Sequence, residues 1–339
     1  MRAIELPVAE RAALLQRERA LIDASRPFME SLSRAAGADR HAAMLADRGC
    51  QVLDVVGDEA SVRGPESVPG PGALLAEANA GANGHGTALA EMTYVELVGP
   101  EHFIEGFHVF TCQGIPLLGA AGELVGVIGI SVRRLETASR VRDVLFCASQ
   151  GVECELLARW LSEVVVTREL HGRLEERLRQ EIVQELASAR LRLEAAARRI
   201  ARGAAASELM AAARELLDTF RARALTWRDL VSDELPAPAP IDLPDLVDSV
   251  LGLLEAEARA SGIRLRWGRA DRAVVVEDRQ ALARGVLGQA LTAMQRAGRD
   301  GAVVVDLERA SRSATVSITA LNTAGAVLGT TSTDCRLRT

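Results

Sequence analysis

Hydrophobic positions near the N-terminus recur at the spacing of an α-helix. The apolar residues that share one helical face over residues 1–26 are Val8, Leu14, Leu15, Leu21 and Ile22. Polar residues and a proline interrupt this pattern between Asp23 and Pro27. We therefore expect a leading helix over 1–26 and a separate domain that begins at Pro27.

Residues 27–134 show the pattern of short strands. The segments HAAMLADRGCQVLDVVGD (41–58) and GELVGVIGISVRR (122–134) contain short apolar, β-branched runs bounded by Gly and Asp. The segment between them that is rich in Gly, Pro and Asn (64–89) predicts a loop with a short helix. Together with a closing helix, these elements predict a mixed α/β domain over 27–165.

The region from 135 to 230 has helical periodicity almost throughout, and Gly203 is the predicted turn between two long helices. One apolar stripe runs along the first part of this region. Its members are Leu170, Leu174, Leu178, Ile182, Leu186, Ala189 and Leu193. Because a single hairpin cannot bury such a stripe, we expect residues 166–233 to pair with a second copy in a homodimer.

A proline-rich segment (ELPAPAPIDLP, 234–244) predicts a linker, because repeated prolines favour extended backbone. After it, residues 245–339 follow the order helix, strand, helix, hairpin. This order predicts a third, C-terminal domain in which helices cover one face of a sheet. The overall fold class is therefore α+β.

Composition and charge exclude several classes of protein. The chain has 40 basic and 46 acidic residues among 339, a net charge of −6 that gives no general attraction for nucleic acid. The Arg-rich stretch over 189–202 is better explained as the solvated face of a helix. Five scattered cysteines form no CxxC pair, and neither a signal peptide nor a membrane span is evident. We expect a cytoplasmic protein with no membrane or nucleic-acid partner.

Residues 81–131 carry several motifs in a fixed order: G-x-N-x-x-GTALAE, EHF, TC-x-x-x-P and a closing G-x-L-x-G-V hairpin. The matching positions are Gly81, Asn83, Gly86, Thr87, the run 88–91, Glu101, His102, Phe103, Thr111, Cys112, Pro116, Gly122, Leu124, Gly126, Val127 and Ser131. The region resembles the GAF-type sensor domain of acetoin-catabolism-type bacterial transcription activators. The resemblance implies an antiparallel sheet with helices behind it and a small-molecule pocket in front.

Aromatic, imidazole and thiol groups gather in the same region, which suits a mostly apolar small-molecule site. The candidate ligand-binding residues are Met92, Phe103, Phe107, His108, Phe110 and Cys112. Two alternatives stay open: Cys112 is a small buried hydrophobe or a ligand contact, and His102 and His108 are structural residues or ligands of a metal or haem. Core packing explains Cys147 and Cys154 best. We predict no metal site, and the sequence does not identify the ligand.

The second half resembles a bacterial sensor histidine kinase of the two-component type, with a dimerisation hairpin, a connector and an ATPase-like sandwich. The helix DRQALARGVLGQALTAMQRAG resembles the N-box helix of that family, but its two asparagines fall on Gln289 and Ala293. Alanine has no oxygen for the magnesium of ATP. The aspartate of the DxGxG turn is replaced by Leu321 or shifted to Asn322, with Gly325 at the end of the turn. We interpret this domain as a truncated, degenerate nucleotide-binding module.

The expected phosphoacceptor position also departs from the histidine-kinase pattern. No histidine lies in QEIVQELASARLRLE, where the family's reactive histidine belongs, and His171 in TRELHGRL is a weak candidate because Gly172 replaces the expected acidic neighbour. We expect a non-enzymatic pseudokinase that does not use ATP or magnesium. It would relay a ligand signal by contact to another signalling protein: a kinase, a response regulator or a transcription factor. The alternatives are an active histidine kinase that uses His171 and phosphorylates a response regulator, and a ligand-responsive transcription regulator without its own ATPase.

Overall fold

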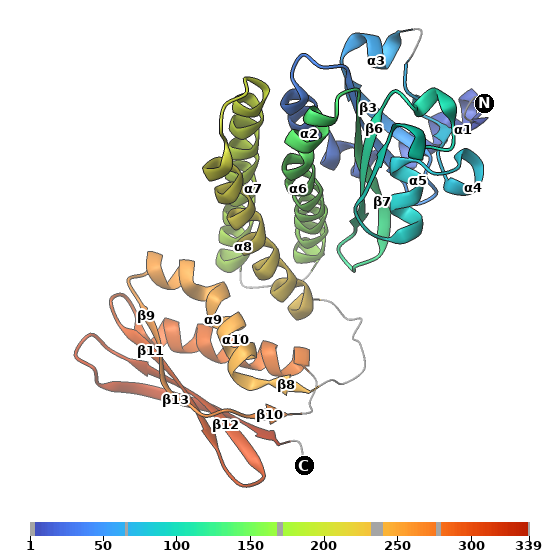
Figure 1. The fold of residues 1–339 in the computed structure, drawn as a ribbon. Coiled ribbons are helices and arrows are strands. Elements are labelled where there is room, and N and C mark those ends of the chain that lie inside the picture. Colours follow the sequence, from blue (N-terminus) through green and yellow to red (C-terminus); the bar gives the residue numbers. More distant parts are fainter. Residues whose placement is uncertain (1–3, 65–66, 168–171, 232–239, 276–278, 338–339) are drawn as a thin grey trace. The chain divides into compact units, whose positions relative to one another are not determined.

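The fold is taken from a computed structural model, which describes residues 4–64, 67–167, 172–231, 240–275 and 279–337 (Figure 1). The chain divides into two compact units. The first contains Met1–Glu163 and Arg179–Arg221, and the second contains Val164–Leu178 and Ala222–Thr339. Among the described residues, no helix combines the length and the apolar character that a membrane span needs.

A five-stranded antiparallel sheet forms the centre of the first unit. Its strands are β2 (His41–Asp47), β3 (Val52–Gly57), β5 (Val95–Val98), β6 (Thr111–Leu118) and β7 (Leu124–Val132). They are arranged in the order β3-β2-β7-β6-β5. The predicted strands at 41–58 and 122–134 are therefore present. Because β2, β7 and β6 are central, most of their side chains are buried on both faces.

The N-terminal segment forms two helices, α1 (Val8–Arg17) and α2 (Arg19–Ala36). The predicted break at Pro27 is wrong, since α2 continues through it. Proline removes only one backbone donor, whereas the face that includes Phe28, Met29 and Leu32 is buried almost completely. Burial of this face against the sheet outweighs the local cost of the proline.

Short elements cover the opposite face of this sheet (Figure 1). They are β1 (Ile4–Glu5), α3 (Glu59–Arg63), β4 (Ala73–Leu74), α4 (Glu77–Ala80), α5 (Gly84–Glu91) and the single-turn helices η1 (Gly99–Glu101) and η2 (Glu105–Phe107). β1 pairs with β4, which ties the N-terminus to this layer. These elements, with the sheet face beneath them, enclose an apolar core.

Three long helices follow: α6 (Leu135–Thr167), α7 (Gly172–Ala201) and α8 (Ser207–Val231). The predicted turn at Gly203 is confirmed by its φ of 71°, a left-handed value that glycine adopts easily. α7 contacts α2 through an ion pair of 2.6 Å between Arg34 and Glu194, and α8 contacts α6 through the hydrogen bond between Gln150 and Asp218.

The apolar stripe of α7 is buried inside a single chain where its side chains are described. Leu186, Ala189 and Leu193 are at most 7% exposed without any second copy. The argument that this stripe needs a partner chain is therefore wrong for its C-terminal half, because the hairpin packs against α2 and α6 instead. The side chains of the earlier stripe positions and His171 lie outside the described residues.

The second unit contains a four-stranded sheet of order β13-β12-β11-β9. Its elements are β8 (Ile241–Asp242), α9 (Leu243–Ala260), β9 (Arg264–Ala270), β10 (Val274–Val275), α10 (Arg279–Ala297), β11 (Ala302–Arg309), β12 (Ser313–Leu321) and β13 (Val327–Arg336). Helices α9 and α10 pack on one face (Figure 1), and side chains of β12 alternate between buried and half-buried. The predicted α+β sandwich is present, and β13 is an additional strand.

Candidate functional site

A small cavity lies between the β6–β7 face of the first sheet and the layer that contains α5. Its volume is about 20 Å³. It is lined by Met44, Val68, Pro69, Leu75, Asn83, Gly84, His85, Phe107, Phe110, Cys112 and Ser131. The predicted residues Phe107, Phe110 and Cys112 thus meet at one cavity. Such a volume holds about one water molecule, since one water needs roughly 10–15 Å³ measured in this way.

The G-x-N-x-x-G motif builds the wall of this cavity. Asn83 caps α5: its Oδ1 accepts hydrogen bonds from the backbone N–H groups of His85 (3.1 Å) and Gly86 (2.9 Å). Its Nδ2 donates to the carbonyl oxygens of Leu75 and Gly81, both at 2.8 Å. Because all these bonds lie within the loop, Asn83 fixes the loop's shape and has little capacity left for a ligand.

His85 is a cavity residue that the sequence alone did not place. It is 2% exposed, and its Nε2 donates to the Met44 carbonyl oxygen at 3.2 Å. The ring lies against Gly129, where a Cβ atom would come within 2.8 Å of it. Burial lowers the pKa of His85 to about 4, and the bond to Met44 offsets only part of this effect. The ring is therefore neutral near pH 7, with Nδ1 as its acceptor nitrogen.

Cys112 and Ser131 face each other across the paired strands β6 and β7. Their side chains meet at an Sγ–Oγ distance of 3.0 Å. Burial raises the pKa of the Cys112 thiol to about 12, even though the contact with Ser131 lowers it somewhat. Cys112 is therefore a protonated wall residue and not a nucleophile at neutral pH.

Three other predicted residues lie away from this cavity. Phe103 is 70% exposed and stacks over the Gly81 backbone, and Met92 is 50% exposed at the left-handed C-cap of α5. His108 lies at the surface, where Nε2 contacts the His102 carbonyl oxygen at 3.0 Å. The reason is geometric: these residues belong to turns around the sheet, so closeness in sequence to Cys112 does not bring them to its face.

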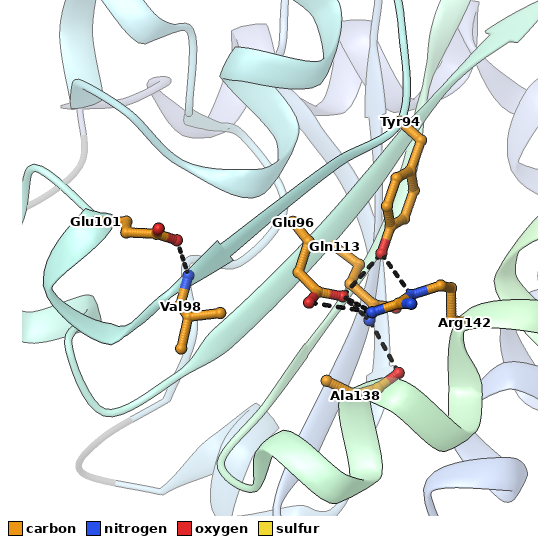
Figure 2. A network of polar contacts seen from close by, with 7 residues as sticks. All are labelled: Tyr94, Glu96, Val98, Glu101, Gln113, Ala138 and Arg142. Atoms are coloured by element: carbon orange, nitrogen blue, oxygen red, sulfur yellow. Dashed lines mark hydrogen bonds and ion pairs between the residues drawn. The ribbon is translucent and has the colours of Figure 1, made fainter.

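Gln113 follows Cys112 on β6 and therefore points to the opposite face of the sheet. It is completely buried, and its Nε2 donates to Glu96 Oε2 (2.7 Å) and to the Ala138 carbonyl oxygen on α6 (2.9 Å; Figure 2). Neighbouring residues of one strand thus contact the cavity and the first turns of α6.

Polar side chains surround this contact (Figure 2). Arg142 on α6 pairs with Glu96 at 2.9 Å and donates to the Tyr94 hydroxyl, which in turn donates to Glu96 at 2.8 Å. Partial burial raises the pKa of Glu96, but the hydrogen bonds from Arg142, Tyr94 and Gln113 outweigh it and hold the pKa below its usual value. In the same view, Glu101 accepts from the backbone N–H of Val98 at the end of β5. Glu96 is therefore ionised at neutral pH and anchors α6 to the edge of the sheet.

A second polar link joins the far end of β6 to the helices. Glu153 on α6 accepts a hydrogen bond from the backbone N–H of Leu118 (3.0 Å) and pairs with Arg221 on α8 (3.0 Å). Burial raises the pKa of Glu153, although both partners act in the opposite direction. β6 is thus connected to α6 at two points, and through Glu153 to α8.

The residues predicted for a vestigial nucleotide site have structural roles in the second unit. Gln289 on α10 donates to Thr333 Oγ1 on β13 at 2.6 Å, and Ala293 is 4% exposed in the core. Asn322 closes the turn between β12 and β13, because its Oδ1 accepts from the N–H groups of Ala324 (3.0 Å) and Ala326 (2.8 Å). Gly325 adopts a φ of 81° in this turn. The two strands are therefore joined by a five-residue turn over 322–326.

Residues 20–150 match the family model of the GAF domain. This chain contains a GAF domain. Over 144 residues it is 29% identical to a "Signal-transduction and transcriptional-control protein" of Clostridium beijerinckii. The aligned stretch covers 42% of this chain and 23% of that relative. The match confirms the GAF resemblance, and its first residue falls within α2, which agrees with the continuous helix through Pro27.

Solved structures resemble different parts of the chain. One is the Escherichia coli DhaR(N)-DhaL complex, with a TM-score of 0.44, 17% identity, and coverage of 47% of this chain and 55% of that one. Another is the catalytic domain of histidine kinase ThkA, with a TM-score of 0.25, 18% identity, and coverage of 26% of this chain and 60% of that one. Each of these structures covers about half of this chain or less.

Proposed function

We propose that this protein is a signal-transduction sensor in which a small molecule in the GAF cavity changes the packing of α6 and α8. The observation that carries the proposal is the placement of Cys112 and Gln113 on opposite faces of β6. A displacement of β6 by an occupant of the cavity would change the hydrogen bond of Gln113 to Ala138 on α6 at the same time. Such coupling is a shift between two packing states and needs no chemical step.

The helix α8 offers a route to the second unit. Its residues up to Arg221 belong to the first unit and those from Ala222 to the second. Because an α-helix is stiff along its axis, a change at Arg221 is carried into the residues that follow it. We propose that the second unit passes this change by contact to another signalling protein in the cytoplasm. We also propose that the chain works as a homodimer through residues 166–233, by surfaces other than the buried positions Leu186, Ala189 and Leu193.

We further propose that the second unit is a pseudokinase. Ala293 supplies no oxygen for magnesium. The acceptor oxygen of Asn322 is already engaged by two backbone N–H groups. The turn over 322–326 also leaves no space between β12 and β13 for a lid segment over a nucleotide. Each of these features supports a sandwich that does not bind ATP.

The sensor proposal can be tested by filling the cavity from within. In a Ser131→Leu variant of the full chain, hydrogen exchange measured by mass spectrometry should change in α6 around Ala138 and in α8 around Arg221. The matched control adds Gln113→Leu, which keeps the side-chain size but removes both hydrogen bonds of the amide. We expect the change in α6 to be lost in the double variant. An equal change with and without Gln113 would refute the relay through this residue.

The pseudokinase proposal is tested by calorimetry with Mg-ATP on the full chain. We expect no binding heat at millimolar nucleotide. Stoichiometric, magnesium-dependent binding would refute the proposal and would favour an active histidine kinase. In that case an acid-labile phosphate that disappears in His171→Gln would identify the acceptor.

A further inference from the structure

A groove on the first unit lies between the helices α6 and α8. Its volume is about 470 Å³, which is comparable with the roughly 300–1,000 Å³ of small-molecule sites. The described residues that line it are Asp143, Phe146, Ser149, Gln150, Glu153, Arg214 and Arg221, and none of them lines the GAF cavity. The two helices run in the same direction here, because Gln150 meets Asp218 and Glu153 meets Arg221.

The charged side chains of this groove fall into two sets. Glu153 and Arg221 neutralise each other in an ion pair of 3.0 Å, and Glu153 also accepts from the backbone N–H of Leu118. Asp143 on α6 and Arg214 on α8 are both exposed, and neither forms a hydrogen bond or an ion pair with another residue of the described chain. The groove therefore offers one carboxylate and one guanidinium to an external partner.

Arg214 lies close to the middle of α6. Burial raises the pKa of the Cys147 thiol to about 11, and the nearby charge of Arg214 opposes this rise. Arg214 is therefore at the level of Cys147, the residue that follows Phe146. Asp143 and Phe146 are three residues apart on α6, so they share one face of that helix. Asp143, Phe146 and Arg214 thus border the same part of the groove.

Phe146 supplies an apolar surface beside the two charges. Its side chain is 38% exposed, although its ring also packs against Tyr94, with ring centres 5.0 Å apart. The hydroxyl of Ser149 donates to the Phe146 carbonyl oxygen at 2.9 Å, which leaves the Ser149 oxygen as an acceptor. The α6 side of the groove therefore combines an aromatic ring with hydrogen-bond acceptors, whereas Arg214 on the α8 side only donates.

We propose that this groove is a second ligand site, specific for small zwitterions that carry an aromatic ring, of which an aromatic α-amino acid is the simplest. The ammonium group meets Asp143 and the oxygen of Ser149, the carboxylate pairs with Arg214, and the ring packs on Phe146. A molecule with only one of the two charges leaves the other side chain unpaired and is repelled by it. This inference is independent of the sensory role proposed for the GAF cavity.

Three fluorinated probes of nearly equal size test the selection by charge. They are 4-fluoro-L-phenylalanine, 3-(4-fluorophenyl)propanoate without the ammonium group, and 2-(4-fluorophenyl)ethylammonium without the carboxylate. Binding to the full chain at pH 7 is measured from the broadening of the ¹⁹F signal. We expect saturable binding of the amino acid and about fivefold weaker binding of each analogue, a factor typical of one exposed ion pair. L-Alanine, which lacks the ring, should not displace the amino acid at equal concentration.

Two variants assign each charge to its partner. Arg214→Gln should weaken the amino acid and the propanoate but not the ethylammonium probe, whereas Asp143→Asn should weaken the amino acid and the ethylammonium probe but not the propanoate. Arg192→Gln is the matched control, because Arg192 is an exposed arginine on α7 that does not line the groove. It should leave the binding of all three probes unchanged.

Each contrary outcome overturns the proposal. Equal binding of the three probes would show that the groove does not select by charge, and a lack of saturable amino-acid binding at millimolar concentration would show that there is no such site. Losses in Arg192→Gln as large as in Arg214→Gln would indicate a general effect of net charge. An effect of Arg214→Gln or Asp143→Asn that is equal for both analogues would indicate a structural change and not a direct contact.

Discussion

The buried ring of His85 should make the GAF domain sensitive to acid. The pKa of this ring is about 4 in the folded state and about 6.5 in the unfolded chain, because folding removes the ring from water. Between these values the unfolded state binds more protons than the folded state. The free energy of unfolding therefore decreases as the pH falls from about 6.5 towards 4.

The size of the effect follows from the pKa difference. At about 1.4 kcal/mol per pKa unit, the full difference corresponds to roughly 3 kcal/mol. Between pH 7 and pH 5 we expect a loss of about 2 kcal/mol from His85 alone. The other titratable lining residue, Cys112, does not contribute, because its thiol stays protonated up to about pH 12. Carboxylates elsewhere add their own pH dependence, so the measurement needs a control that lacks only the imidazole.

His85→Gln provides this control, since a glutamine amide can still donate to the Met44 carbonyl oxygen but does not titrate. Urea unfolding is followed by fluorescence in a Trp227→Phe, Trp267→Phe background, in which Trp160 on α6 reports on the first unit. Between pH 7 and pH 5 the parent should lose about 2 kcal/mol more than His85→Gln. Equal losses in the two proteins would refute the conclusion that the ring is buried in its neutral form.

Three further predictions concern other parts of the chain. Asn83→Ala should lower the free energy of unfolding of the first unit by about 3 kcal/mol in urea melts, because it removes the helix cap and leaves buried carbonyl groups without donors; a loss under about 1 kcal/mol would contradict the capping role. Leu193→Ala should cost about 3 kcal/mol independently of protein concentration, because Leu193 is buried within one chain; a loss that changes on tenfold dilution would indicate burial in a dimer. Glu153→Gln should increase hydrogen exchange around Arg221 while leaving exchange around Ala138 unchanged, and an equal increase at both places would show that the two links are not separate.

Much of the fold could be predicted from local patterns. Gly203 ends a long helix, and β12 of the second unit alternates between buried and half-buried side chains, because short-range sterics and periodic burial act over a few residues. Pro27 misled the prediction, because the stability of α2 comes from a face buried against the sheet, which local propensity does not contain.

The candidate site was predictable only in part. Phe107, Phe110 and Cys112 belong to one stretch of sequence and line the cavity. His85 completes the cavity because β2 and β7 place Met44 and Gly129 against its ring. A histidine in a glycine-rich loop has no sequence pattern that shows where its ring points. The G-x-N-x-x-G motif indicated that the loop has a constrained conformation, but it did not show that this conformation places the His85 ring at the cavity.

The sequence by itself determined the presence of a GAF domain, the α+β character of the chain and the loss of the side-chain oxygen at Ala293, because motifs and residue types carry this information without a structure. Only the tertiary structure decided that the cavity is neutral and small, that Gln113 and Glu153 connect β6 to α6 and α8, and that the described half of the α7 stripe is buried within one chain. These properties depend on which surfaces exclude water and which atoms meet across strands and helices. Water exclusion and these contacts both depend on residues that are far apart in sequence. Short-range conformational preferences along the chain therefore do not predict them.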